Sequence, residues 1–103
     1  MAINVFIVKE DFRIIIKKMD RIDVDDNFFK LREIANQEQC IFISTLDDIG
    51  ATLINELQLD EFKEEIQKLS KRLDVDQKKL NQLKSIADAV DTRGCQYIKF
   101  IGE

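Results

Sequence analysis

The pattern of apolar and polar residues along this chain predicts short strands followed by amphipathic helices. Residues 3–9 (INVFIVK) are apolar and rich in β-branched side chains, and residues 11–17 (DFRIIIK) alternate apolar with basic positions. Both patterns are typical of strands, and Glu10 and Asp11 between them favour a tight turn. One continuous bent strand running through residue 18 is the alternative interpretation.

A polar connection and an amphipathic helix are expected next. Residues 20–27 (DRIDVDDN) have the composition of a turn-prone loop. Apolar side chains then recur at helical spacing, at Phe28, Leu31, Ile34 and Ala35. Asp26 or Asn27 is expected to cap this helix, because a side-chain oxygen there can accept a hydrogen bond from a free backbone N–H of the first turn.

The next segment, residues 40–45 (CIFIST), is short and rich in β-branched residues, so it is predicted to form an inner strand. The serine and threonine that end it stand three residues before Asp47 and Asp48, which is the spacing of a capping box and predicts a helix from about residue 47. Gly50 would then lie in the first helical turn. Since glycine costs roughly 1 kcal/mol there relative to alanine, its presence suggests a close packing contact.

The clearest periodicity predicts two antiparallel helices and a final strand. The first apolar stripe has gaps of three and four residues and consists of Leu59, Phe62, Ile66, Leu69 and Leu73. The second predicts a helix over 76–91 and consists of Leu80, Leu83, Ile86, Ala87 and Val90. Asp74 or Asp76 is the expected cap of the second helix, and Glu64 stands four residues before Lys68, where it can form a weak supporting pair. Residues 95–102 (CQYIKFIG), after Gly94, are predicted to form a strand.

These elements predict an α+β fold with the order β-β-α-β-α-α-α-β, in which helices pack on one face of a small sheet of about four strands. Proline is absent and glycine occurs only three times, so no flexible linker divides residues 1–103. A coiled coil is the alternative for residues 59–73, but it usually needs three or more heptads. The side chains expected to be buried are Leu59, Phe62, Ile66, Leu69, Leu83, Ala87, Ile98 and Phe100.

Composition argues against several classes of function. The 103 residues include no histidine, which excludes ordinary zinc sites and histidine-based triads. The net charge of −4 argues against a non-specific nucleic-acid binder. Cys40 and Cys95 have no metal-binding spacing, and we expect both to be free and buried unless the fold brings them together as a disulfide. No cofactor or metal is expected, and the short apolar run at the start, without a basic region before it, favours a cytoplasmic protein.

The acidic motifs do not form a recognisable catalytic or metal site. Asp23, Asp25 and Asn27 match the first, third and fifth ligands of a calcium loop, but Phe28 replaces the required glycine and Ile34 the final glutamate. Two adjacent carboxylate pairs, residues 47–48 and 60–61, could in principle do acid–base work, but no tyrosine or tryptophan platform for a sugar accompanies them. The chain is therefore expected not to be an enzyme.

Charge is distributed unevenly along the chain. Residues 23–65 carry three basic and twelve acidic side chains, whereas the segments before and after are net positive. If the loop at 20–27, the turn at 47–48 and the helix start at 60–65 converge, they form an acidic surface that would speed association with a basic partner. The candidate binding residues are Asp23, Asp25, Asp26, Asp47, Asp48, Asp60, Glu61 and Glu64. The alternative is that acids near helix N-termini only complement helix dipoles.

Part of the sequence resembles a known group of proteins. Residues 44–69 (STLDDIGATLINELQLDEFKEEIQKL) and the terminal YIKFIGE at 97–103 resemble small bacterial proteins that end in a Tyr-Leu-x-Phe-x-Gly-Asp type strand. These proteins are similar to immunity proteins of polymorphic toxin systems, including contact-dependent growth inhibition. The resemblance covers about the last 60 residues, and Glu103 departs from it by replacing the aspartate.

The resemblance implies a single immunity-protein-like domain that binds and blocks the toxic domain of a cognate effector. The expected target is a nuclease, first a tRNA-cleaving enzyme and second a DNase, whose basic cleft the acidic protein would cover. The protein itself would then be a monomer or weak dimer that contacts neither nucleic acid nor membrane.

Two other classes of function stay open. One is an antitoxin or small transcriptional regulator, although no helix-turn-helix pattern is apparent. Its DNA contacts would come from basic residues across the two predicted helices: Lys68, Lys71, Arg72, Lys78, Lys79 and Lys84. The other is an adaptor that dimerises through its helical stripes.

Overall fold

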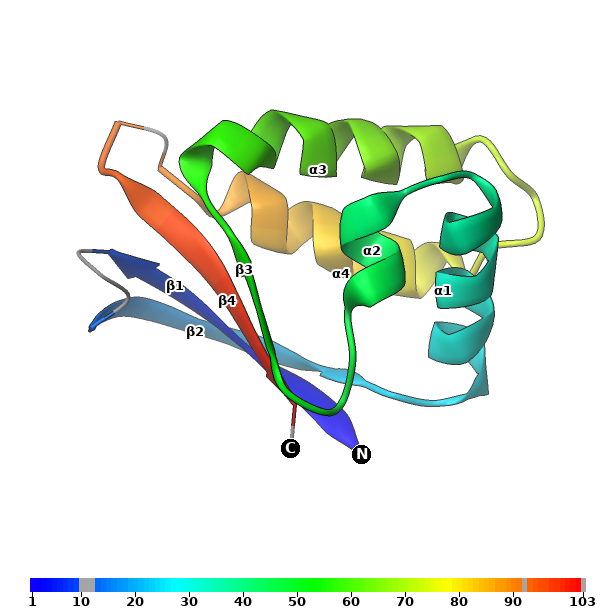
Figure 1. Ribbon diagram of the computed structural model, residues 1–103, viewed down its shortest axis with the longest axis horizontal. Helices are drawn as coiled ribbons and strands as arrows, with labels where there is room; N and C mark the ends of the chain where they lie inside the picture. Colours follow the sequence, from blue (N-terminus) through cyan, green and yellow to red (C-terminus); the bar gives the residue numbers. More distant parts are fainter. Residues whose placement is uncertain (10–12, 92, 103) are drawn as a thin grey trace.

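The computed structural model describes residues 1–9, 13–91 and 93–102, and it shows an antiparallel sheet with helices packed on one face (Figure 1). The predicted α+β class is confirmed. The order of elements differs slightly from the expected one and is β-β-α-α-β-α-α-β. The elements are β1 (Ala2–Lys9), β2 (Ile14–Asp23), α1 (Asp26–Gln37), α2 (Ile41–Thr45), β3 (Ala51–Ile54), α3 (Glu56–Ser70), α4 (Gln77–Asp88) and β4 (Gln96–Gly102).

The sheet has the strand order β2-β1-β4-β3, and every neighbouring pair is antiparallel. The first and last of these strands along the chain, β1 and β4, therefore form its centre. Alternate side chains of the two central strands point toward the helices and are buried: Ile3, Val5 and Ile7 on β1, and Ile98 and Phe100 on β4. The opposite face of the sheet carries no helix among the described residues.

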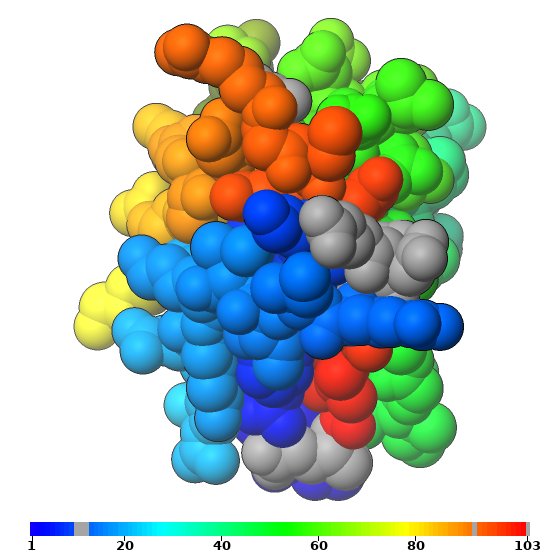
Figure 2. Space-filling view, turned by 90° about the vertical axis from the view of Figure 1, so that its left-hand side faces the viewer, coloured from blue at the N-terminus to red at the C-terminus, as the bar shows by residue number. Residues whose placement is uncertain are grey.

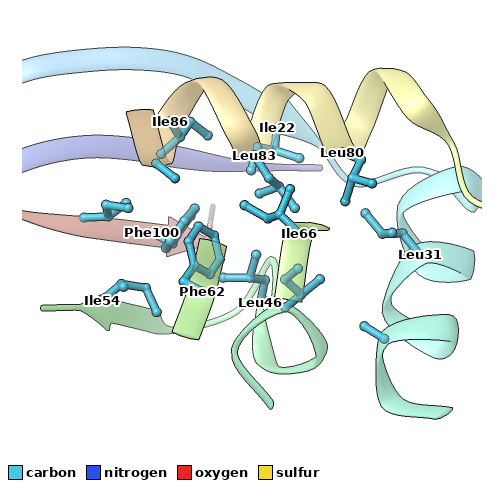
Figure 3. Close-up of a cluster of buried hydrophobic side chains, with 14 of the residues drawn as sticks. Ile22, Leu31, Leu46, Ile54, Phe62, Ile66, Leu80, Leu83, Ile86 and Phe100 are labelled. Carbon is cyan, nitrogen blue, oxygen red and sulfur yellow. The ribbon is translucent and has the colours of Figure 1, made fainter. Parts of the chain in front are cut away.

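The core lies between this sheet and the helices (Figure 3). The Phe62 ring of α3 meets the Phe100 ring of β4 at a centroid distance of 6.0 Å. All eight side chains expected to be buried are buried, so that prediction is confirmed. Because α3 and α4 run antiparallel and turn their apolar stripes into this core, the stripes are not available to a partner helix. This arrangement does not favour the coiled-coil and stripe-mediated adaptor alternatives.

The first two strands form a hairpin rather than one bent strand. The tight turn predicted at Glu10 and Asp11 lies outside the described residues. The second strand is longer than expected, because β2 continues to Asp23 through much of the predicted loop at 20–27. Helix α1 is capped by Asp25 instead of Asp26 or Asn27, with its carboxylate oxygen accepting from the Phe28 N–H at 2.9 Å.

The strand predicted at 40–45 and the helix predicted from residue 47 are both wrong. Residues 41–45 form the short helix α2, and residues 51–54 form the edge strand β3. Gly50 lies in the turn before β3 with φ +85°, a conformation that glycine adopts without strain, so its role is in a turn and not in a helix.

A long-range cap explains why CIFIST does not extend into a strand. The carboxylate of Glu65 on α3 accepts hydrogen bonds from the backbone N–H groups of Phe42 and Ile43, at 3.1 and 3.0 Å. The hydroxyls of Ser44 and Thr45 then donate to carbonyls three residues earlier. These contacts satisfy the polar groups of one helical turn and override the β propensity of the segment.

The boundaries of α3 also correct the sequence analysis. The capping box is formed by Asn55 and Gln58, and the helix ends at Ser70. Leu73 therefore lies beyond the helix and is fully exposed instead of extending the buried stripe. Asp76 is the cap of α4, one of the two expected candidates, and its carboxylate accepts from the N–H groups of Lys78 and Lys79.

The two cysteines are free thiols. Cys40 is buried as expected, and burial raises the pKa of its thiol. Cys95 is exposed, which corrects the expectation that both are buried. Among the described helices, none is long and apolar enough to cross a membrane.

Candidate partner-binding surface

The structure separates the predicted acidic residues into three groups. Asp23, Asp25 and Asp26 lie where β2 leads into α1, and residues 47–48 lie in the turn between α2 and β3. The remaining residues, Asp60, Glu61 and Glu64, lie on α3. Figure 1 places α3 along the top of the molecule and the turn before β3 at the bottom, so the three groups do not converge on one face.

The first group is engaged in contacts that hold the fold together. Besides capping α1, the Asp25 carboxylate lies 3.2 Å from the Lys79 ammonium, which also donates to the Asp23 carbonyl oxygen at 2.7 Å. The Asp23 carboxylate lies 3.6 Å from the guanidinium of Arg21. The Phe28 N–H hydrogen bond and Lys79 lower the pKa of Asp25. Only Asp26 of this group is exposed without such an assigned role.

We expect Asp25→Asn to keep the cap of α1, because asparagine is also a good N-cap. The substitution should instead change how the free energy of unfolding depends on pH. A carboxylate with a lowered pKa in the folded state stabilises the fold above its unfolded pKa, and this contribution is lost as pH falls through the folded pKa. The variant should thus be less stable at pH 7 by about 0.5–1 kcal/mol, since the Asp25 side chain of the pair with Lys79 is half exposed and screened by water. Urea titrations should show this difference shrinking below pH 4. A constant difference would contradict the assignment.

In the second group Asp48 is buried, whereas the Asp47 side chain is 42% exposed. Asp48 is only 7% exposed, and Asp47 pairs with the Arg32 guanidinium at 3.8 Å. A hydrogen bond between the two carboxyl groups raises the pKa of Asp48 and lowers that of Asp47. The turn is fastened to the sheet by the Gly102 N–H, which donates to the Gly50 carbonyl at 2.8 Å. Asp48 therefore serves the turn, and the partly exposed Asp47 is already paired with Arg32.

The third group forms an exposed stripe on α3. Leu57, Asp60, Glu61 and Glu64 have the spacing of one helix face, opposite the buried residues of the same helix. The three carboxylates make no ion pair with any residue in the described ranges. The expected pair between Glu64 and Lys68 does not form, because the Lys68 ammonium turns to the Glu38 carbonyl oxygen at 2.8 Å.

A groove of about 260 Å³ runs between this stripe and α2. Its lining includes Ile41, Glu61, Glu64 and the half-buried Glu65, whose pKa is raised mainly by burial. Two large apolar side chains border the carboxylates, Ile41 at 60% exposure and Leu57 at 85%. We call Ile41, Leu57, Asp60, Glu61 and Glu64 the α3 acidic surface. Acidic groups around exposed apolar side chains can bind a basic protein surface through both charge and burial.

Sequence reasoning found the three carboxylates and missed the two apolar residues. Ile41 was assigned to an inner strand, and Leu57 lies outside the buried stripe. Leu57 stands three, four and seven residues before Asp60, Glu61 and Glu64, and this helical spacing was the available signal that it shares their exposed face. The exposure of Ile41 depends on α2, whose cap comes from Glu65, 23 and 22 residues from the two N–H groups that it accepts.

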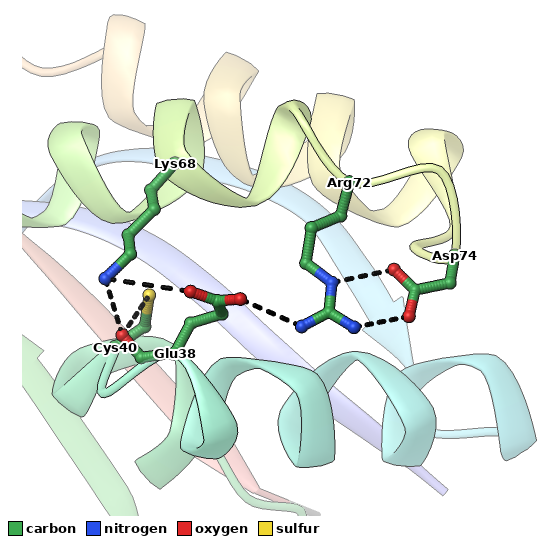
Figure 4. Close-up of polar contacts among 5 residues, drawn as sticks. All are labelled: Glu38, Cys40, Lys68, Arg72 and Asp74. Atoms are coloured by element: carbon green, nitrogen blue, oxygen red, sulfur yellow. Dashed lines mark hydrogen bonds and ion pairs between the residues drawn. The ribbon is translucent and has the colours of Figure 1, made fainter.

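Some of the basic residues considered for DNA binding form ion pairs within the fold. Figure 4 shows Arg72 between two carboxylates, with the guanidinium 2.9 Å from Glu38 and hydrogen-bonded to Asp74. These partners raise the pKa of Arg72, and Arg72 lowers that of Asp74. Lys68 and Lys79 are also engaged, with Glu38 and Asp25 respectively. Three of the six basic residues are thus paired with acids, which weakens the interpretation as a regulator.

Comparisons with protein-family models, with curated proteins and with solved structures find no match to this chain.

Proposed function

We propose that this protein is a cytoplasmic immunity protein that binds a cognate toxin domain, most directly a nuclease, and blocks its basic active-site cleft. The observation that carries the proposal is the α3 acidic surface, where three carboxylates that form no ion pair within residues 1–9, 13–91 and 93–102 border two exposed apolar side chains. The sequence resemblance over residues 44–69 and 97–103 supports the same function.

The proposal uses one part of the expected binding face, the acids of α3, and adds two apolar residues to it. Within 23–26 and 47–48 every acid except Asp26 is engaged in a cap, an ion pair or a packed turn, so the energetic contacts are placed on α3 and α2. In such an interface Leu57 and Ile41 would be the apolar anchors, and the surrounding carboxylates would steer association and fix the orientation. Inhibition by this route is stoichiometric and needs no catalytic group, so we also propose that the protein is not an enzyme.

The first test uses the genomic neighbour of this chain. The proposal requires an adjacent reading frame for a large secreted protein with a variable C-terminal domain, and expression of that domain should arrest growth. Co-expression of this chain should restore growth. A neighbouring toxic domain that remains toxic in the presence of this chain would contradict the proposal.

Binding kinetics then test the surface. We expect Asp60→Lys with Glu61→Lys to slow association with the toxin domain by roughly ten-fold or more at low salt, and by less at high salt, because steering is screened. The matched control is Glu33→Lys with Asp88→Lys, which changes the net charge equally at exposed positions on α1 and α4. Equal slowing by both double variants, measured by surface plasmon resonance, would reject the α3 acidic surface even if the protein protects against the toxin.

A further inference from the structure

The face of the sheet turned away from the helices has a defined composition. On the two central strands it carries the partly exposed Asn4 and Phe6 of β1 and Tyr97, Lys99 and Ile101 of β4, together with Val8, which is only 1% exposed. Lys18 of β2 lies opposite Phe6, and Ile15 of β2 lies opposite Val8. Figure 2 views this face obliquely, with β2, β1, β4 and β3 following one another from left to right in the lower half.

Two aromatic rings occupy neighbouring positions at the centre of this face. Phe6 is directly opposite Lys99 across the β1–β4 pair, and Tyr97 is opposite Val8, so the two rings are diagonal neighbours at roughly 7–8 Å between backbones. Both rings are half-buried, which leaves part of each accessible. The Lys18 ammonium lies 5.9 Å from the centroid of the Phe6 ring. Phe6 is therefore flanked by a lysine on each neighbouring strand.

Charge within the sheet contrasts with the acidic whole. The four strands carry five basic side chains, Lys9, Lys17, Lys18, Arg21 and Lys99, and two acidic ones, Asp20 and Asp23. The net charge of −4 argued only against a non-specific nucleic-acid binder. Two of these cations, Lys18 and Lys99, lie beside Phe6 on the open face, and the α3 acids that have no ion pair within the described residues lie on another side of the molecule.

We propose that the open sheet face, centred on Phe6 and Tyr97 with Lys18 and Lys99, binds single-stranded RNA. Aromatic rings on the central strands of a four-stranded antiparallel sheet provide stacking platforms for successive bases, and flanking lysines contact the phosphates. Stacking of a base on an aromatic ring contributes more binding free energy than an exposed cation–π contact. A base can therefore displace the Lys18 ammonium from the Phe6 ring.

The two lysines on this face favour RNA over a protein as the binding partner. Lysine is depleted at the centre of protein–protein interfaces, where its ammonium would lose water without compensation. Here two lysines flank the central ring, which suits a chain of phosphates and bases. The site does not involve the α3 acidic surface, so the proposal does not depend on the proposed toxin binding.

Fluorescence anisotropy with a labelled uridine oligomer of about 12 nucleotides tests the proposal, with the intact protein at about 50 and 200 mM salt. Saturable binding that weakens with salt is expected. Phe6→Leu and Tyr97→Leu should each weaken binding by about ten-fold, because they keep an apolar side chain and lose the ring. Tyr97→Phe keeps the ring and should bind as the unchanged protein does. Melting curves of each variant confirm folding.

The phosphate contacts have a charge-matched control. Lys18→Glu with Lys99→Glu should weaken binding by ten-fold or more, whereas Lys71→Glu with Lys84→Glu, on exposed helix and loop positions, should leave it within two-fold. No binding at low salt would overturn the proposal. Equal loss in both charge variants, or unchanged binding by a folded Phe6→Leu, Tyr97→Leu double variant, would also overturn it. Equal affinity for the matching thymidine oligomer would overturn the assignment to RNA.

Discussion

Leu69→Ala is expected to lower the free energy of unfolding by about 2–5 kcal/mol, the range for large-to-small changes in a packed core. Leu69 is completely buried on the face of α3 that packs into the core. The loss combines the transfer of the removed methyl groups with the cavity that remains. Since domains of this size are usually stable by about 5–15 kcal/mol, this one change is expected to remove a large share of the stability. Urea denaturation followed by circular dichroism measures it.

Leu73 provides a matched control within the same sequence stripe. It is fully exposed beyond the end of α3, so Leu73→Ala should change the free energy of unfolding by no more than about 0.5 kcal/mol. Equal losses for the two variants would mean that α3 continues to Leu73 and buries it, contrary to the structure.

Gly102→Ala should also be strongly destabilising, by about 1–3 kcal/mol or more, because it overpacks the end of β4. A methyl group at this position would overlap the backbone carbon and oxygen of Asp48 and the backbone nitrogen of Ile49. Backbone atoms cannot rotate away as a flexible side chain can. Relief would require the turn to move, at the cost of the hydrogen bond from the Gly102 N–H to the Gly50 carbonyl. Thermal and urea unfolding of the variant measure the loss.

Gly94→Ala is the control for this glycine effect. The nearest atom to a methyl group there is 3.5 Å away in the flexible side chain of Gln96, an ordinary contact. Gly94→Ala should leave the free energy of unfolding unchanged or raise it by up to about 1 kcal/mol, because alanine lowers the conformational entropy of the unfolded chain. If both substitutions proved neutral, the close approach of β4 to the turn would be wrong.

Helices and strands could be predicted from the sequence where the spacing and composition of their own residues determine the structure. The stripe from Leu59 to Leu69 needs only helical spacing, and β1 and β4 are apolar runs with turn residues beside them. The segments 40–45 and 51–54 were assigned wrongly because their structure depends on distant partners. Glu65 caps α2, and β3 is a strand because it pairs with β4. Local β propensity and an apparent capping box therefore pointed to the wrong elements.

The candidate surface was predictable only in part for the same reason. Counting charges along the chain identified an acidic centre, but it could not show that Asp25 meets Lys79 or that Asp47 meets Arg32. Once the acids in such contacts are set aside, Asp26 and the acids of α3 remain. Counting charges by segment could not show the two lysines of the open sheet face either. Lys18 and Lys99 are 81 positions apart in the sequence, and only the strand order β2-β1-β4 places both beside Phe6.

The central position of β4 has a consequence for how the chain folds during synthesis. β4 lies between β1 and β3, so neither of these strands has its full set of partners until residues 96–102 have left the ribosome. Until then the β1–β2 hairpin has one open edge that is rich in apolar residues, and β3 has no strand to pair with. Unpaired apolar edges favour aggregation. Before β4 is available the nascent chain is thus exposed to misassembly, and the addition of β4 completes the sheet between β1 and β3.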